Sequence, residues 1–368
     1  MQHDKLTLTL PWEDIDAQAQ QQIRKVLELP ELVRLVIMPD VHAGYDLCIG
    51  GVALLRRTVC PSFVGYDIGC GMCHVNTGKD LAVLGLDTKK SREDLFALLR
   101  QRIPAGLGKG HKTDSGIRFT SACGDRELEK SITPLVDAQL GTLGSGNHFL
   151  ELGVNAAGQL GVTVHSGSRR CGYDIAASYM KKGRLLSLDS ALGQAYLADM
   201  QWALDFALEN RRRMLEQALL ALGFTAAECA AFIHSTGFIN ETHNHALIAA
   251  DRLVLHRKGA TPAEKGQLGV IPANQRDGVY ITRGLGNDEY LSSASHGAGR
   301  IFSRKAATRQ GDIKELQRLM KGIICRTDAA VLDEAPWAYK DIDAVLRAQK
   351  GLVVDVVDHF KPVIVLKG

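Results

Sequence analysis

The chain is organised around Val64-Gly65-Tyr66-Asp67-Ile68-Gly69-Cys70-Gly71-Met72. Asp67 and Cys70 lie three residues apart among glycines, after an apolar run that begins at Pro61. Residues three apart point to opposite faces of a regular strand. The glycines allow a bend that would bring the carboxylate and the thiol to one point. Such a pair suits a borderline transition metal, and a glycine-rich turn with a buried aspartate cap is the alternative.

Length and composition indicate a folded protein without a membrane segment. The chain has 368 residues, 45% of them hydrophobic, which is ample for a large core. Its net charge of +3 permits an anionic partner but does not require one. No apolar run reaches the roughly 18 residues of a membrane span, and the N-terminus lacks the pattern of a signal peptide. Eight scattered cysteines then predict free thiols in the cytoplasm.

Local patterns predict both helices and strands. Helices are expected at 16–29, 92–103 and 190–222, and Thr225 with Glu228 predicts a capping box for a further short helix. The last two would form a helical hairpin near 190–232, with Arg211 to Arg213 in its exposed end. Strands are expected at 34–38, 50–55 and 61–64. Polar motifs are dispersed from Asp40 to Lys367, which predicts one α+β domain over 1–368, with mixed β-sheets flanked by helices.

Histidines recur beside glycine or small polar residues. A single histidine of this kind is usually structural, but His148, His165, His243 and His296, together with Asp67 and Cys70, favour a metal cluster. This set exceeds the ligands of one tetrahedral ion, so two ions bridged by a thiolate are conceivable.

Two local patterns have competing interpretations. Cys70-Gly-Met-Cys73-His74 matches the c-type haem attachment pattern, but haem attachment needs an exported protein, and Cys73 and His74 fit the strand that follows. A redox pair is a further alternative. The segment that ends in Lys112-Thr113 resembles a P-loop, yet His111 replaces the required glycine, so we expect a glycine-rich loop.

A third motif, His296-Gly-Ala-Gly-Arg300, suits a phosphate group. Its glycines let a phosphate approach the backbone, Arg300 can neutralise the charge, and Arg304 follows one helical turn later. A histidine here could be a nucleophile toward phosphorus. The alternative is a glycine loop at a helix start with a capping histidine.

Taken together, these segments resemble the RtcB RNA ligase family over essentially the whole chain. The resemblance runs through the following motifs: Met38-Pro-Asp-Val-His42, Val64–Met72, Gly141–Glu151, His165–Arg169, His243-Asn244, Lys258-Gly-Ala260, Lys265-Gly-Gln267, Arg283–Arg300 and the final Lys367-Gly368.

The resemblance implies an enzyme that ligates RNA ends. One RNA would carry a 2′,3′-cyclic phosphate or 3′-phosphate and the other a 5′-hydroxyl, with GTP and two Mn²⁺ ions as cofactors. His296 would attack the α-phosphate of GTP, Asp40 would orient His296, and the guanylate would pass to the RNA 3′-phosphate before the 5′-hydroxyl displaces GMP. We expect a monomer.

The same resemblance assigns residues to ligands. One Mn²⁺ would be held by Asp67, Cys70 and His148, and the other by Cys70, His165 and His243. Arg169, Arg300 and Arg304 would hold phosphates of RNA or GTP. The residues expected to contact the nucleotide are Asn147, Glu151, Asn274, His296, Gly297, Ala298, Gly299 and Lys367.

Some segments depart from the family pattern. The family's Pro-Gly-Ser-Met segment is Pro272-Ala-Asn-Gln275 here, and the chain is shorter than most members. These changes resemble a divergent group of short bacterial paralogues whose expected role is repair of nicked RNA, ribosomal RNA among the candidates. A metal-dependent RNA end phosphatase or cyclic phosphodiesterase and a non-catalytic RNA-binding paralogue are the alternatives.

Overall fold

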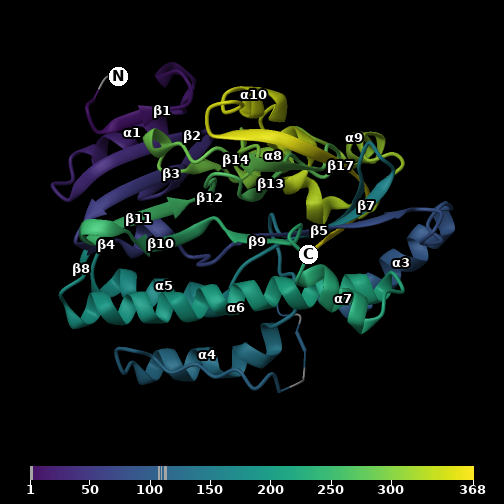
Figure 1. The fold of residues 1–368 in the computed structure, drawn as a ribbon, viewed down its shortest axis with the longest axis horizontal. Coiled ribbons are helices and arrows are strands. Elements are labelled where there is room, and N and C mark those ends of the chain that lie inside the picture. The colour runs from purple at the N-terminus through teal and green to yellow at the C-terminus, as the bar shows by residue number, and fades with distance from the viewer. Residues whose placement is uncertain (1–2, 107, 109, 112–113) are drawn as a thin grey trace.

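The computed structural model describes residues 3–106, 108, 110–111 and 114–368. Figure 1 shows β-sheets in the upper part of the molecule and a layer of helices beneath them. The α+β prediction is confirmed. Strands from distant parts of the chain share one sheet, as expected if the predicted single domain is correct.

One sheet has five strands in the order β1-β2-β3-β11-β10. β1 is parallel to β2, and the other neighbours are antiparallel. The bounds are β1 (Leu6–Leu8), β2 (Leu32–Tyr45), β3 (Leu47–Arg56), β10 (Asn244–Ile248) and β11 (Leu253–Lys258).

The larger sheet has eight strands. Seven follow the order β13-β14-β17-β6-β7-β5-β9, and β16 pairs with β17. Two small sheets, β12-β15 and β4-β8, complete the set. The bounds in the larger sheet are β5 (Gly71–Asp80), β6 (Phe149–Val154), β7 (Gln159–Ser166), β9 (Ile239–Thr242), β13 (Leu268–Pro272), β14 (Val279–Gly284), β16 (Ile324–Cys325) and β17 (Val354–Lys367). Those in the small sheets are β4 (Thr58–Val59), β8 (Leu186–Ser187), β12 (Ala260–Pro262) and β15 (Ser293–Ser295).

Side-chain caps begin most of the helices. Asp16, Thr88 and Ser190 each accept a hydrogen bond from a backbone N–H of the first turn, and Thr225 forms the predicted capping box. The predicted hairpin is therefore present as α6 and α7. The bounds are α1 (Ala17–Leu27), α2 (Pro61–Val64), α3 (Lys89–Arg102), α4 (Arg126–Gln139), α5 (Arg169–Lys182), α6 (Ala191–Ala221), α7 (Ala226–Ile233), α8 (Arg304–Gln310), α9 (Ile313–Leu319) and α10 (Ile342–Arg347).

Helix α6 contributes to two core clusters. Its first half, including Tyr196 and Phe206, packs against apolar residues of α4 and α5. Its second half, including Met214 and Leu219, packs against α3 and the strands β5, β6 and β7. In Figure 1 this helix runs across the molecule beneath the sheets. All eight cysteines are free thiols, as expected. None of the helices in the described part of the chain is long and apolar enough to cross a membrane.

The strand predicted at 61–64 is wrong, because these residues form the short helix α2. Pro61 occupies the first turn, where its fixed φ suits a helix and its missing N–H costs nothing. Gly65 ends the helix with a φ of 91°. An apolar run of four residues does not distinguish a buried strand from a buried helical turn. Lys112 and Thr113, which end the P-loop-like segment, lie outside the described residues.

The prediction that Arg211 lies in the exposed end of the hairpin is also wrong. Arg211 is fully buried within α6. Its guanidinium donates hydrogen bonds to Asn240 Oδ1 at 2.7 Å, to the Gly69 carbonyl at 2.7 Å and to the Ser166 carbonyl at 2.9 Å. The guanidinium has enough donors to satisfy carbonyls from separate segments at once.

We predict that Arg211→Met lowers the free energy of unfolding by about 3–5 kcal/mol, because it leaves buried acceptors without a donor. Arg213→Met is the matched control on the same helix. The Arg213 side chain is partly exposed and pairs with Glu209 at 2.7 Å, so its loss should cost less than about 1 kcal/mol. Urea unfolding of both variants checks this, and equal losses would contradict it.

Candidate metal and nucleotide site

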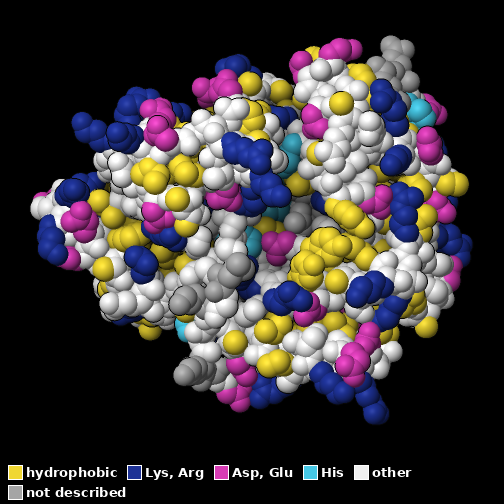
Figure 2. Space-filling view, turned by 180° about the vertical axis from the view of Figure 1, so that it is seen from behind, with side chains coloured by type: hydrophobic (Ala, Val, Ile, Leu, Met, Phe, Trp, Pro, Cys, Tyr) yellow, Lys and Arg dark blue, Asp and Glu magenta, His cyan; other side chains and the backbone are white. Residues whose placement is uncertain are grey.

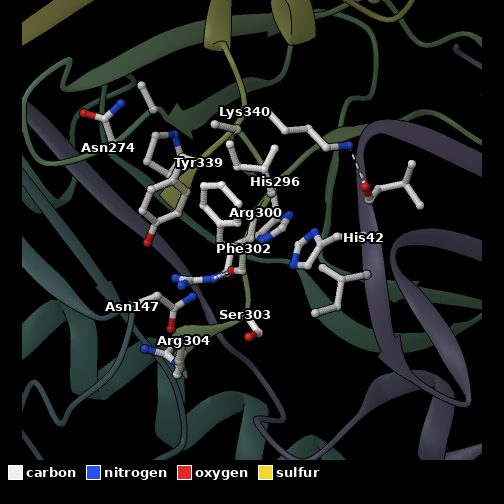
Figure 3. Close-up of a pocket in the computed structure, with 18 of the residues that line it drawn as sticks. His42, Asn147, Asn274, His296, Arg300, Phe302, Ser303, Arg304, Tyr339 and Lys340 are labelled. Atoms are coloured by element: carbon white, nitrogen blue, oxygen red, sulfur yellow. Dashed lines mark hydrogen bonds between the residues drawn. The ribbon is translucent and has the colours of Figure 1, made fainter. Parts of the chain in front are cut away.

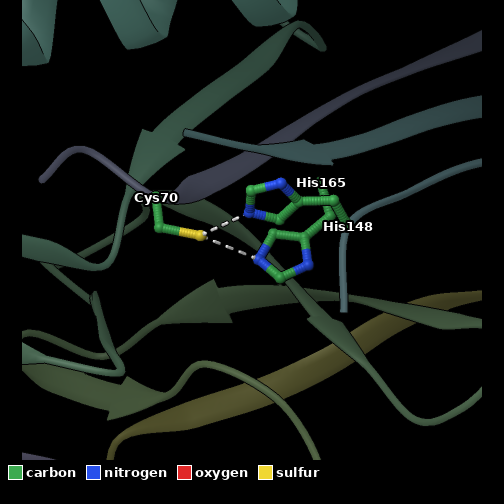
Figure 4. Close-up of side chains that lie close together, drawn as sticks. All are labelled: Cys70, His148 and His165. Carbon is green, nitrogen blue, oxygen red and sulfur yellow. Dashed lines mark hydrogen bonds between the residues drawn. The ribbon is translucent and has the colours of Figure 1, made fainter. Parts of the chain in front are cut away.

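Cys70, His148 and His165 form a buried cluster with the composition of a metal site. The Cys70 Sγ lies 3.4 Å from His148 Nε2 and 3.3 Å from His165 Nε2 (Figure 4). One ligand atom from each of the three residues lies within 4.8 Å of the others. A thiol with two imidazoles fits a transition metal.

Two further predicted ligands lie on either side of this cluster. The Asp67 carboxylate contacts His148 Nε2 at 3.0 Å, and His243 Nε2 lies 3.4 Å from His165 Nε2. The structure thus brings all five predicted metal ligands together. Asp67 and His148 lie at one end of the group, and His165 and His243 at the other.

Backbone carbonyls orient two of the imidazoles. His148 Nδ1 lies 3.0 Å from the Leu143 carbonyl, and His165 Nδ1 lies 3.2 Å from the Asn147 carbonyl. A carbonyl only accepts, so at His165 this contact favours a proton on Nδ1 and leaves the Nε2 lone pair toward the cluster. His148 Nε2 faces the Asp67 carboxylate and would have to give up any proton that it donates there before it could bind a metal. The same arrangement orients histidine ligands in metal sites. The donor set and its orientation therefore fit a metal ion.

Protonation in this group follows from burial. Burial raises the pKa of the Cys70 thiol, and the Asp67 carboxylate adds to the effect. Burial also lowers the pKa of His165 and His243, so both imidazoles are neutral, which is the form that binds metals. Burial alone would raise the pKa of Asp67, but the hydrogen bond with His148 lowers it to about 2. Metal binding would have to release the thiol proton.

The turn before β6 explains how Asn147 and His148 can both face the site. Gly144 and Gly146 adopt φ values of 85° and 76°, so the residues up to His148 do not follow strand geometry. A side chain at position 144 would also collide with the Arg169 guanidinium. Arg169 lies against the metal group, with its Nη1 3.1 Å from His148 Nδ1.

His296 forms a close pair with a buried carboxylate. Asp40 is fully buried, and its Oδ2 accepts hydrogen bonds from His296 Nδ1 at 2.7 Å and from the His296 backbone N–H at 3.1 Å. This pair fixes the proton on Nδ1 and leaves the Nε2 lone pair available. The His296 ring centroid lies 4.9 Å from that of His243. The predicted nucleophile therefore adjoins the predicted metal ligands.

A pocket of about 940 Å³ opens beside His296. Figure 3 shows Asn147, His296, Arg300, Arg304 and Tyr339 around it. Figure 2 shows one face of the molecule hollowed near its middle, with histidine, acidic and basic side chains in and around the hollow. The pocket lining includes every predicted nucleotide residue, namely Asn147, Glu151, Asn274, His296, Gly297, Ala298, Gly299 and Lys367, together with Arg300 and Arg304.

Glu334 organises the cations at this pocket. Its carboxylate is buried and pairs with Lys367 Nζ at 3.0 Å, with Arg300 Nη1 at 3.0 Å and with Arg304. The Tyr339 hydroxyl also donates to it. Burial alone would raise the pKa of Glu334, but the three cations and the hydroxyl lower it to about 2. Sequence reasoning missed Glu334, because no motif marks it within Asp333-Glu-Ala-Pro-Trp337.

Two predicted nucleotide residues behave differently at the pocket. The Glu151 carboxyl is buried, burial raises its pKa, and its Oε1 has no hydrogen-bond partner among the described residues. Asn274 is already engaged in its own turn. Its Oδ1 accepts from the backbone of Arg276 and Asp277, and its Nδ2 donates to Asp277 Oδ2 at 2.7 Å. Glu151 Oε1 is thus free to bind a ligand, whereas Asn274 could offer a ligand only its second Nδ2–H while it stays in its turn.

The chain is similar to known proteins over nearly its whole length. A family model described as "tRNA-splicing ligase RtcB" matches residues 22–368. The chain is similar to the RNA-splicing ligase RtcB of Escherichia coli K12, with 33% identity over 392 residues covering 96% of this chain and 95% of that protein. The tRNA-splicing ligase RtcB of Nanoarchaeum equitans is 31% identical, with coverage of 94% and 91%. The RNA-splicing ligase RtcB2 of another Escherichia coli strain is 29% identical, with coverage of 96% and 93%.

We predict that Cys70→Ala lowers the bound metal far more than His148→Ala does. Cys70 contacts histidines of both ends of the group, whereas His148 contacts one end. Elemental analysis after loading with Mn²⁺ and desalting gives the stoichiometry. Full metal content in Cys70→Ala would mean that the thiol is only a small core side chain.

We also predict that Glu334 stabilises the fold in a pH-dependent way. A glutamate in the unfolded chain takes up its proton near pH 4.5, whereas Glu334 stays ionised in the folded chain down to about pH 2. Its contribution, on the order of 3 kcal/mol, is full above about pH 4.5 and is lost as the pH falls toward 2.

Urea unfolding between pH 2 and 6 measures this contribution. Glu334→Gln should have a flatter stability profile than the natural protein over that range. Glu315→Gln, which removes an exposed carboxylate paired with Arg318, should follow the natural profile. Parallel curves for the natural protein and Glu334→Gln would contradict the assignment.

Proposed function

The chain belongs to the RtcB family of tRNA-splicing ligases, and on that premise we propose that it is a GTP- and Mn²⁺-dependent RNA ligase. It would join a 3′-phosphate or 2′,3′-cyclic phosphate end to a 5′-hydroxyl end through a guanylate on His296. Nicked RNA, with ribosomal RNA among the candidates, would be its substrate.

The observation that carries this proposal is the Asp40–His296 pair at the junction of the pocket and the metal group. The Nδ1 proton is held by a fully buried carboxylate at 2.7 Å. The other ring nitrogen, Nε2, is then a neutral nucleophile whose developing positive charge Asp40 would stabilise. A histidine that served only as a helix cap would not need a buried carboxylate behind it.

The proposed reaction has three transfers. Nε2 of His296 forms a bond to the α-phosphorus of GTP, and the bond from that phosphorus to pyrophosphate breaks. An oxygen of the RNA 3′-phosphate then takes the guanylate, which breaks the N–P bond. Finally the 5′-hydroxyl attacks the activated 3′-phosphorus, loses its proton and releases GMP. A cyclic phosphate end must first be hydrolysed to the 3′-phosphate.

Residues of the chain would supply the binding for these steps. Arg300, Arg304 and Lys367 line the pocket and would neutralise phosphate groups. The buried Glu151 carboxyl would accept or donate a hydrogen bond at the base. Asp67, Cys70, His148, His165 and His243 would hold the Mn²⁺ ions, which would neutralise phosphate charge and polarise the attacked phosphorus.

The alternative activities account for less of the structure. A metal-dependent RNA end phosphatase or cyclic phosphodiesterase could act through the metal group alone. A non-catalytic RNA-binding paralogue would need neither the metal group nor the paired histidine. The ligase proposal is the one that uses the metal group, the pocket and the Asp40–His296 pair together.

We predict that His296→Ala abolishes the covalent GMP adduct without changing the fold or the metal content. The measurement is incubation with α-labelled GTP and Mn²⁺, followed by denaturing electrophoresis and by mass spectrometry of the intact protein. The label on the natural protein should be acid-labile and alkali-stable, as a phosphoramidate is. Equal labelling of His296→Ala would overturn the assignment of the nucleophile.

Asp40→Asn is the companion variant. An amide can donate to Nδ1 and so favours the wrong tautomer, which should slow adduct formation at least about a hundredfold by analogy with other carboxylate–histidine pairs. If the adduct forms at the natural rate in Asp40→Asn, the carboxylate does not orient His296 for attack.

A further inference from the structure

Three tyrosines from separate segments form an aromatic cluster on the surface. The ring centroids of Tyr45 and Tyr66 are 5.7 Å apart, and those of Tyr66 and Tyr173 are 4.9 Å apart with planes inclined by 22°. Tyr45 is 56% exposed and Tyr173 is 42% exposed. We call Tyr45, Tyr66 and Tyr173 the tyrosine surface. The Tyr66 and Tyr173 rings stack on each other, and the exposed parts of the Tyr45 and Tyr173 side chains are where a ligand with flat rings could add to this cluster.

The tyrosine surface is joined to the metal group by the chain itself. Tyr66 directly precedes Asp67. Tyr173 lies in the first part of α5, which begins with Arg169, the residue whose guanidinium contacts His148 at 3.1 Å. The chain therefore places Tyr66 and Tyr173 within a few residues of the metal group, on a part of the surface other than the pocket beside His296, whose lining includes none of the three tyrosines.

Cationic side chains accompany the rings. The Arg170 guanidinium lies 4.7 Å from the centre of the Tyr173 ring, and Asp174 holds it at 2.6 Å. Arg184 and Tyr45 line a separate cavity of about 380 Å³, where Asp46 pairs with Arg184 at 2.8 Å. Asp174 and Asp46 fix the guanidinium groups of Arg170 and Arg184 in place beside the rings. From these positions the guanidinium groups can also contact phosphate oxygens.

We propose that the tyrosine surface binds unpaired nucleotides of the RNA strand whose end lies at the metal group, by stacking their bases. This inference rests on the proposed function. Flat aromatic faces with adjacent arginines, next to a site for RNA ends, are the combination that single-stranded nucleic acid uses. A base-paired end would present stacked, covered bases, so the surface favours ends with unpaired nucleotides.

The test measures RNA binding by fluorescence anisotropy in the intact, Mn²⁺-loaded protein. The probes are a short single-stranded RNA with a 3′-phosphate, one with a 5′-hydroxyl, and a blunt duplex of the same sequence. Tyr45→Ala/Tyr173→Ala is the main variant, and Tyr45→Phe/Tyr173→Phe retains the rings. Ile248→Ala changes a 59% exposed side chain on β10 and serves as a surface control. Thermal unfolding verifies the fold of each variant.

The alanine pair should weaken binding of at least one single-stranded probe about tenfold or more, since stacking of one base contributes roughly 5- to 150-fold. The phenylalanine pair and Ile248→Ala should stay within about twofold of the natural protein, and the blunt duplex should bind all variants equally. Tyr173→Ala alone should cause part of this loss of affinity. Alanine is well tolerated at this position, because Tyr173 lies within a helix.

Abasic nucleotides sharpen the test. Removing one base near the end of the probe should weaken binding to the natural protein by a similar factor and have little further effect in the alanine pair, because both changes remove the same contact. Arg170→Gln should lower the slope of log affinity against log salt concentration by about one.

The inference is overturned if the alanine pair binds both single strands as the natural protein does, or if it loses affinity for the duplex equally. Unchanged RNA binding by the alanine pair would assign the tyrosines to a protein partner or to the fold alone. The proposed function is tested separately, because it fails if the natural protein forms no GMP adduct, whatever the tyrosines bind.

Discussion

One buried guanidinium connects the segments that supply most of the metal group. Arg211 on α6 binds the carbonyls of Gly69 and Ser166 and the side chain of Asn240. Gly69 precedes Cys70, Ser166 follows His165, and Asn240 lies on the strand that leads to His243. Arg211 thus holds together the segments next to three of the five predicted ligands, from a helix whose two halves pack in different core clusters. The α6 helix therefore helps to position a group of residues to which it contributes no predicted ligand.

Local signals were sufficient to predict much of the fold, because they depend on neighbouring residues. The capping box at Thr225 and the apolar spacing along α6 are signals of this kind. The sequence around Arg211 does not reveal which groups its side chain contacts, because those groups lie far away along the chain. Three consecutive arginines resemble a solvated face, and only the positions of Gly69 and Ser166 show that one of them is buried. The run 61–64 was misassigned because four apolar residues carry too little periodicity to separate strand from helix.

Where a motif suggested its own chemistry, as at Asp67, Cys70 and His296, the sequence named residues that the structure brings close to the predicted histidine ligands. Glu334 was not predictable in this way, since its role arises from the convergence of Lys367, Arg300 and Arg304 on one buried oxygen pair. A count of charges would have provided a clue, because three cations at a buried pocket require a compensating anion. Asp40 and Glu334 are both buried carboxylates behind the lining of one pocket, but the first holds His296, the proposed nucleophile, and the second fixes the positions of cations.

Residues that meet at the site lie far apart in the sequence, and this affects when the site forms during folding. Cys70 meets partners 78 and 95 residues away, and Asp40 meets His296 across 256 residues. Contacts this distant form late in folding, because closing large loops costs entropy before the contacts compensate for it. A partly folded chain therefore lacks both the metal group and the paired histidine. Any chemistry that needs both the metal group and the Asp40–His296 pair would therefore begin only in molecules that have completed the fold.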